Sequence, residues 1–259
     1  MTIKLHFESQ GHGEPVLILH GLFGSGSNWK SFARKLADDF HVITVDLRNH
    51  GKSAHSQTMT YREMAMDIQH IMGKLDIREI SLIGHSMGGK AAMVYSLICS
   101  QMLDRLIVLD IAPVQYKNTI NSLLENLEEL PLNKLSGRKE ADKLLSGKIP
   151  FTSLRLFLLQ NLVQDDKHYR WRFNLESIKQ NTDELSGFPE LDSSEPYHGP
   201  ALFIAGTESP YIREEHLPAI NKYFPRAEIH YINNAGHWLH IDQPEKLLEK
   251  IRSFLQPGQ

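Results

Sequence analysis

Hydrophobic residues recur along the chain at two spacings, and these spacings predict its secondary structure. Short continuous apolar runs are typical of strands that are buried on both faces of a parallel sheet. Between the runs, apolar residues recur every three or four positions, as on the buried face of a helix. The predicted buried strands are residues 16–19, 42–45, 80–83, 106–109 and 201–204. Residues 229–232 are expected to form the last strand, and residues 3–8 alternate like an edge strand.

The predicted strands alternate with predicted helices, which indicates βαβ units. The helices are expected at residues 29–37, 61–75, 87–100, 212–223 and 244–255. This order predicts an α/β fold with a mostly parallel central sheet and helices on both faces. In such sheets ligands bind beyond the carboxyl ends of the strands, so the chemistry should lie along that edge.

The pattern changes between residues 113 and 196. Apolar residues there keep helical spacing with polar breaks, no buried strand is visible, and residues 171–174 could form a short extended piece. Because this segment leaves the sheet at the active edge and must return there, we expect a helical cap over a core domain of residues 1–112 and 197–259. A separate interaction domain is the alternative, but no Gly/Ser/Pro-rich linker bounds the segment.

Composition excludes several classes of protein. With 259 residues, 41% of them hydrophobic, the chain can bury a sizeable core, and its net charge of -3 gives no basic footprint for nucleic acid. A single cysteine rules out an intrachain disulfide. No apolar run reaches the roughly 18 residues of a membrane span, and no signal peptide is visible. We therefore expect a cytoplasmic protein, either a monomer or a homodimer, without a nucleic-acid partner.

The stretch around Ser86 carries the strongest chemical signal. An apolar strand stops at Gly84, turns on Ser86 and continues directly as a helix. In such an elbow the flanking glycines let strand and helix pass closely, and the serine is pushed into solvent. The N–H of Met87, at the start of the helix, lacks a helical partner and can donate to an oxyanion. The alternative is a glycine-rich turn with an inert serine.

A nucleophilic serine needs a base within hydrogen-bond reach and a third group that orients the base. His237 is the leading base, because it follows the last predicted strand in a Gly-containing loop at the active edge. His240 forms an H-x-x-H spacing with it, but no third ligand is placed beside the pair, so we interpret His240 as packing. Arg48 and Asn49 are interpreted as structural. The sequence implies no metal and no cofactor.

Four stretches together resemble the α/β-hydrolase superfamily over nearly the whole chain: His20-Gly21, residues 46–53, residues 84–89 and Gly236-His237-Trp238. Finer strings, among them residues 20–24, 84–90, 110–114 and 209–211, closely resemble bacterial YbfF-type esterases. The resemblance implies serine hydrolysis of acyl esters, and acyl-CoA thioesters are among the substrates that it implies. It also implies a second oxyanion donor in the loop after His20-Gly21, the N–H of Leu22, with Phe23 as the neighbouring alternative.

The chain departs from the usual family pattern at the acid. Most members carry an aspartate in a G-x-x-D loop, whereas here the loop reads Gly206-Thr207-Glu208-Ser209, with serine in that place. Asp110, at the end of the strand before the insert, and Glu208 remain as candidates. We favour Asp110, because a strand carboxyl end places it near Ser86 and the resemblance also suggests it. Ser209 would then be an accessory that bonds the His237–Asp110 pair.

The predicted function is a serine carboxylic-ester hydrolase. Ser86, His237 and Asp110 would form the triad, and the N–H groups of Leu22 and Met87 would hold the oxyanion. The substrate would be a small-molecule acyl ester or thioester. Two alternatives remain: a carbon–carbon bond hydrolase or lyase of the same fold, and a ligand-binding member without turnover.

Overall fold

A central sheet organises the molecule. The computed structural model describes residues 1–165, 168–191 and 195–256, and within this part seven strands pair in the order β1-β3-β2-β4-β5-β8-β9. Strand β1 is antiparallel to β3, and every other pair in this sheet is parallel. The predicted fold class is confirmed. The strands are β1 (His6–Gln10), β2 (Pro15–Leu19), β3 (His41–Asp46), β4 (Ile80–His85), β5 (Leu103–Leu109), β8 (Ala201–Gly206) and β9 (Ala227–Ile232).

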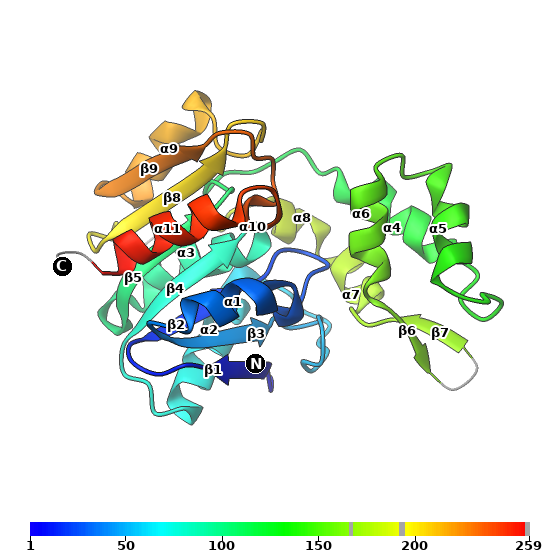
Figure 1. The fold of residues 1–259 in the computed structure, drawn as a ribbon, viewed down its shortest axis with the longest axis horizontal. Coiled ribbons are helices and arrows are strands. Elements are labelled where there is room, and N and C mark those ends of the chain that lie inside the picture. The colour runs from blue at the N-terminus through cyan, green and yellow to red at the C-terminus, as the bar shows by residue number, and fades with distance from the viewer. Residues whose placement is uncertain (166–167, 192–194, 257–259) are drawn as a thin grey trace.

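Helices cover both faces of the sheet (Figure 1). One face packs against α2 (Tyr61–Lys74), α3 (Met87–Ile98) and α9 (Leu217–Tyr223), and the other against α1 (Lys30–Leu36), α10 (Leu239–Asp242) and α11 (Pro244–Leu255). Successive strand residues point to opposite faces. Leu17 and Leu19 accordingly join the first apolar cluster, while Val16 and Ile18 join the second. This two-sided burial explains why the strands read as continuous apolar runs.

Two predicted elements of the core begin several residues later than expected. The edge strand expected at residues 3–8 lies at His6–Gln10, and the helix expected from residue 212 begins as a 3-10 turn, Glu214–His216, before α9. Pro218 lies in the first turn of α9, where its missing N–H costs no hydrogen bond. The turn before it therefore winds more tightly than an α-helix.

Between β5 and β8, none of the residues that the structure describes forms a strand of the central sheet. The helices of this segment are α4 (Ile120–Glu128), α5 (Arg138–Ser146), α6 (Thr152–Leu159), α7 (Leu175–Gln180) and α8 (Thr182–Ser186). Residues 113–196, which we call the cap segment, lie at the end of the sheet where β2, β4 and β5 stop (Figure 1). Strands β6 (Leu162–Asp165) and β7 (His168–Trp171) form an antiparallel hairpin there. This hairpin was not expected from the sequence, because half of its residues are exposed and no apolar run marks it.

Two buried histidines join the loops that follow β2 and β3. His20 accepts the N–H of Leu47 at Nε2, and His50 accepts the N–H of Phe23 at Nε2. The opposite ring nitrogens donate to main-chain carbonyls, so each ring must stay neutral to keep both bonds. Burial lowers the pKa of His20 to about 4 and that of His50 to about 3. The two loops are thereby fixed beside the end of β4.

Arg48 and Asn49 brace the same edge. The guanidinium of Arg48 is fully buried and bonds both carboxylate oxygens of Asp67, at 2.8 and 3.1 Å. Asn49 donates from Nδ2 to Ser177 in the cap segment, and its main-chain carbonyl accepts the N–H of Asn174. Both contacts are structural, as the sequence indicated.

The elbow between β4 and α3 leaves no room for side chains at its glycines. A Cβ at Gly84 would lie 2.3 Å from the carbonyl oxygen of Gly88, and one at Gly88 would lie 2.6 Å from the carbonyl oxygens of Leu19 and His20. These neighbours are main-chain atoms, which cannot rotate away. Strand and helix can touch here only because both residues are glycine.

We expect Gly88→Ala to lower the free energy of unfolding by about 2 kcal/mol or more, because the added methyl group forces α3 away from β2. Gly73→Ala in α2 is the matched control: its Cβ would meet no atom within 4 Å, and we expect a gain of up to about 1 kcal/mol from reduced chain entropy. Urea unfolding of both variants measures the difference. Equal stability of the two would contradict this account of the elbow.

We expect stability to fall as the pH drops from 7 to 5. An unfolded histidine takes up its proton near pH 6.5, whereas His20 and His50 stay neutral in the folded chain. Their contribution is therefore complete above pH 6.5 and is lost as the pH falls towards their folded pKa values. Each histidine should lose about 2 kcal/mol over this interval.

Urea unfolding at pH 7 and pH 5 tests this. His50→Gln keeps a hydrogen-bond acceptor but cannot be protonated, so it should lose about 2 kcal/mol less than the wild type over the same interval. A variant that loses as much as the wild type would show that His50 does not contribute to the acid sensitivity.

Candidate active site

Ser86 lies at the strained turn between β4 and α3. Its backbone has φ 54° and ψ −119°, which is a sparsely populated conformation for a residue with a side chain. The Ser86 N–H donates to the carbonyl of Leu109 at 3.0 Å, which holds the turn against the end of β5. The strand–turn–helix that the sequence predicted around this serine is present.

His237 and Asp110 are hydrogen bonded to each other. The distance from His237 Nδ1 to Asp110 Oδ2 is 2.7 Å, and the Asp110 side chain is fully buried directly after β5. Asp110 Oδ1 accepts the N–H of Gly206 at 3.2 Å, and Oδ2 also accepts the hydroxyl of Ser209. Asp110 therefore has fixed partners on both oxygens, and Ser209 occupies the accessory position that was predicted for it.

Glu208 does not take part in this network. Its residue is exposed, its main-chain N–H donates to Ala235 at 3.0 Å, and its carboxylate bonds no group in the described part of the chain. Of the two acids that the sequence left open, only Asp110 contacts His237.

Two aromatic rings flank the imidazole of His237. The ring of Tyr211 lies 4.2 Å from it between centroids and that of His85 lies 4.6 Å from it. His85 donates from Nε2 to the main-chain carbonyl of His237 at 2.8 Å, and burial, together with the nearby His237, holds the pKa of His85 well below its usual value. A neutral His85 thus fixes the backbone of the base while the rings fix its plane.

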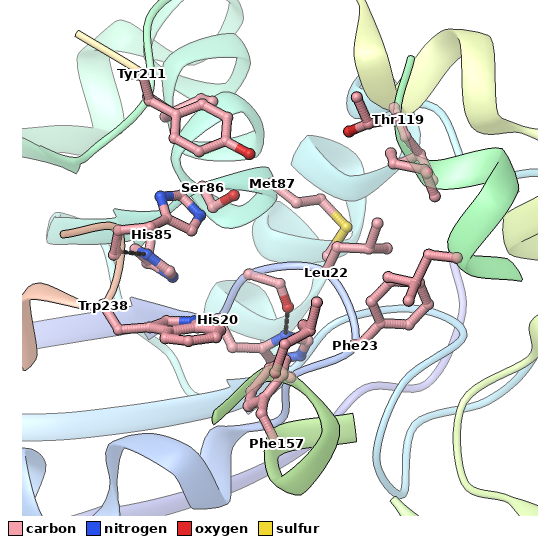
Figure 2. A pocket seen from close by; sticks show the side chains of 18 of the residues that line it. His20, Leu22, Phe23, His85, Ser86, Met87, Thr119, Phe157, Tyr211 and Trp238 are labelled. Atoms are coloured by element: carbon pink, nitrogen blue, oxygen red, sulfur yellow. Dashed lines mark hydrogen bonds between the residues drawn. The ribbon is translucent and has the colours of Figure 1, made fainter. Parts of the chain in front are cut away.

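Ser86 and His237 line the same cavity, and Figure 2 shows the Ser86 hydroxyl among the side chains that surround it. Within the described residues, the Ser86 hydroxyl has no hydrogen-bond partner. Catalytic hydrogen bonds of unliganded enzymes are often long and tighten when substrate binds. Both side chains therefore face the same cavity.

The N–H groups of the two predicted oxyanion donors have no hydrogen-bond partner among the described residues, whereas the N–H of the alternative donor, Phe23, has one. The N–H of Phe23 donates to His50 Nε2 at 3.1 Å. The N–H groups of Leu22 and Met87 make no hydrogen bond to any described residue, and both residues line the cavity. This geometry favours Leu22 over Phe23 as the second donor.

The cavity has a volume of about 500 Å³ and is mostly apolar. Core residues close to Ser86 form its inner wall, and α4, α6 and the loops of the cap segment form the rest. Its apolar lining comprises Leu22, Phe23, Trp29, Met87, Ile111, Ile120, Leu123, Ile149, Pro150, Phe151, Leu154, Phe157, Leu185 and Trp238. Such a lining suits a hydrocarbon chain better than a polar ligand.

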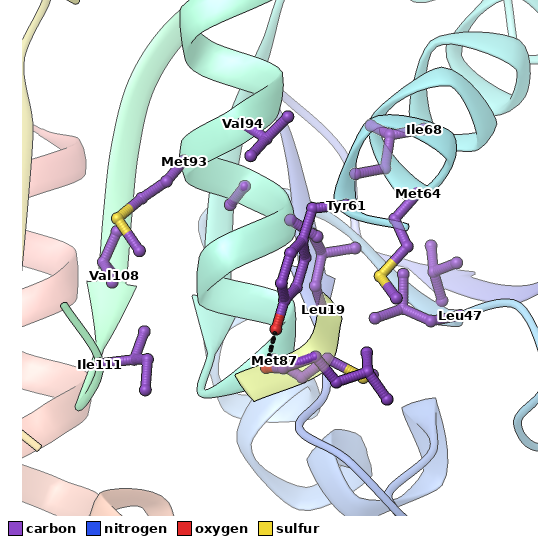
Figure 3. Packing of buried hydrophobic residues seen from close by; sticks show 14 of the residues in the cluster. Leu19, Leu47, Tyr61, Met64, Ile68, Met87, Met93, Val94, Val108 and Ile111 are labelled. Atoms are coloured by element: carbon purple, nitrogen blue, oxygen red, sulfur yellow. Dashed lines mark hydrogen bonds between the residues drawn. The ribbon is translucent and has the colours of Figure 1, made fainter. Parts of the chain in front are cut away.

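A lysine and a tyrosine of the core tie the cap segment to the nucleophile helix. Lys90, one turn after Ser86, is buried and donates from Nζ to the carbonyls of Ser186 and Gly187, and Tyr61 donates to the carbonyl of Leu185 at 2.7 Å (Figure 3). These carbonyls end α8, where a helix leaves acceptors unpaired and favours positive charge. Burial lowers the pKa of Lys90 to about 7.

Several of these contacts were not foreseen from the sequence. Tyr211, His85 and Lys90 each lie within four residues of a predicted site residue, and this proximity was the available signal. His240 stacks on Trp29 at 4.1 Å, which fits its interpretation as packing. The described residues contain no group of three or more side chains that could hold a metal ion, and none of their helices is long and apolar enough to cross a membrane.

Comparison with known proteins finds relatives that are named as esterases and a lipase. The chain is 40% identical over 97% of its length to the sn-1-specific diacylglycerol lipase ABHD11 of Danio rerio, of which it covers 81%. It is 33% identical over 96% of its length to esterase YbfF of Escherichia coli K12, of which it covers 95%. A solved marine microorganism esterase superposes with a TM-score of 0.94 at 39% identity, covering 98% of this chain and 100% of that one.

The resemblance to YbfF-type esterases is thus confirmed. Residues 14–244 match the family described as the alpha/beta hydrolase fold, which is most of the chain. On this match and on the full-length relatives, the chain belongs to the α/β-hydrolase family.

Proposed function

We propose that the chain is a serine carboxylic-ester hydrolase that cleaves acyl esters through an acyl-enzyme. The observation that carries the proposal is the 2.7 Å bond between His237 and Asp110 beside an elbow serine, in a cavity with a mostly apolar lining. The names of its relatives, an esterase and a lipase, support the same reaction class.

In the proposed mechanism each group has a role. Asp110 holds the Nδ1 proton of His237, which leaves Nε2 as the base that removes the proton of Ser86. Ser86 Oγ then attacks the ester carbonyl, and the N–H groups of Leu22 and Met87 hold the negative charge that develops on its oxygen. His237 returns the proton to the leaving alcohol, then activates water for deacylation.

Thioesters are a second substrate class for the same steps. Lys117 and Lys148, both exposed, line the cavity, and among the described residues no acidic side chain lines it, although Lys148 is ion-paired with Glu129 outside the lining. This charge pattern suits the phosphates of an acyl-CoA at the cavity entrance. Acyl-CoA substrates should therefore be assayed beside simple esters.

The proposed mechanism predicts that turnover depends on the acyl length of the ester. p-Nitrophenyl esters from about two to sixteen acyl carbons should be hydrolysed with a clear optimum length, because the cavity is closed on several sides by apolar side chains. Steady-state kinetics with Ser86→Ala as the blank for each ester measures this. Turnover no higher than the blank throughout would instead favour carbon–carbon bond substrates, and then ligand binding without catalysis.

Substitution of the two candidate acids distinguishes Asp110 from Glu208. Asp110→Asn should lower kcat/KM by about 10⁴-fold, because the amide cannot hold His237 in the required tautomer. Glu208→Gln, the matched control, should stay close to the wild type, since that carboxylate contacts nothing in the described site. The reverse ranking of the two variants would move the acid to Glu208.

A further inference from the structure

The hydroxyl of Tyr211 is an unused donor in the cavity. Tyr211 lines the cavity with Ser86 and His237, and its hydroxyl bonds no group in the part of the chain that the structure describes. Its backbone is held on both sides: the N–H donates to Ser209 Oγ at 3.3 Å, and the carbonyl accepts the hydroxyl of Tyr116. These bonds fix the backbone of Tyr211, and the contact of its ring with His237 sets the direction of its polar end.

That direction follows from the hydrogen bonds around Asp110. Ser209 Oγ bonds both the Tyr211 N–H and Asp110 Oδ2, and Asp110 Oδ2 bonds His237 Nδ1. The backbone of Tyr211 therefore lies on the Nδ1 side of the imidazole. The two ring centroids lie only 4.2 Å apart, with the ring planes tilted by 31°. A phenol that starts on the Nδ1 side therefore extends over the imidazole towards its Nε2 side. Figure 2 shows the Tyr211 hydroxyl turned towards the hydroxyl of Ser86.

The phenol keeps its proton under assay conditions. Burial, with a further contribution from the charge of Asp110, raises the pKa of Tyr211 above its usual value. The group is accordingly a neutral hydrogen-bond donor at neutral and mildly alkaline pH, and an acid or a base only beyond that range.

The leaving-group oxygen of an ester must approach the Nε2 side of His237, where the Tyr211 hydroxyl lies. It has to approach His237 Nε2 to receive a proton, whereas the carbonyl oxygen faces the N–H groups of Leu22 and Met87. A donor on the Nε2 side of the histidine therefore meets the leaving oxygen and not the oxyanion.

We propose that Tyr211 is a further catalytic residue, whose hydroxyl donates a hydrogen bond to the leaving-group oxygen as its bond to the acyl carbon breaks. The proposal rests on the proposed ester hydrolysis. When the tetrahedral intermediate collapses, the electron pair of the broken C–O bond passes to the leaving oxygen, and the proton comes from His237 Nε2. Tyr211 keeps its own proton and stabilises the charge that develops before proton transfer is complete.

The test varies the basicity of the leaving group at constant acyl chain. Strongly basic alkoxides need this hydrogen bond, whereas p-nitrophenolate departs without it. Tyr211→Phe keeps the ring that stacks on His237 and removes only the hydroxyl. We expect kcat/KM to fall by about 10- to 100-fold for alkyl esters and by less than about 3-fold for the p-nitrophenyl ester. Using kcat/KM confines the comparison to acylation.

Tyr223→Phe is the matched control, because Tyr223 packs on Phe188 outside the lining of the cavity. It should leave the dependence on leaving group unchanged. Circular dichroism and the Tm show whether each variant folds. Should Tyr211→Phe fail to fold, Tyr211→Leu with the ratio of alkyl to p-nitrophenyl turnover gives the same readout, since the ratio cancels a general loss from the missing ring.

Two results would overturn the proposal. An equal fall for all leaving groups would mean that Tyr211 acts only through the position of His237, and no fall for any of them would leave the hydroxyl without a catalytic role. Neither result affects the proposed function, which depends on whether p-nitrophenyl ester turnover by the wild type requires Ser86.

Discussion

The close contact between β4 and α3 is the constraint on which the site depends. Gly84 and Gly88 bring helix and strand together with no space for a Cβ, and Ser86 between them adopts a strained backbone conformation. The same contact places the first turn of α3 against the carbonyls at the end of β2, next to the loop that contains Leu22. The nucleophile and both proposed oxyanion donors are thus positioned by one packing contact.

Backbone strain is concentrated at the same edge of the sheet. Non-glycine residues with positive φ follow four consecutive strands of the chain, one after each of β2, β3, β4 and β5: Phe23, Asn49, Ser86 and Asp110. Each turn costs about 1 kcal/mol or more, which the packed core must offset. The buried, neutral His20 and His50 hold two of these loops by accepting main-chain N–H groups. The same bonds that make the loops rigid are lost when the rings are protonated, which makes the loops sensitive to acid.

The order of strands and helices was predictable because burial on both faces leaves continuous apolar runs in the sequence. Ser86 was predictable because it follows such a run, and His237 because it follows the last predicted strand in a Gly-containing loop. The Asp110 contact was expected from its position at a strand end and from the family resemblance, whereas Glu208 is exposed and forms no bond to His237. The β6–β7 hairpin and the stacking of Tyr211 on His237 depend on contacts between distant segments, which neither periodicity nor spacing records.

The anchor between α3 and α8 bears on how the cap segment can evolve. Lys90 and Tyr61 bond the main-chain carbonyls of Leu185, Ser186 and Gly187, and no side chain of the cap segment takes part in these bonds. Every amino acid supplies such a carbonyl, so α8 can change its sequence and remain attached, provided that it still ends as a helix there. The cap side chains that line the cavity can then differ among relatives. The distance between the cap segment and the nucleophile is set by Lys90 and Tyr61, which belong to the core.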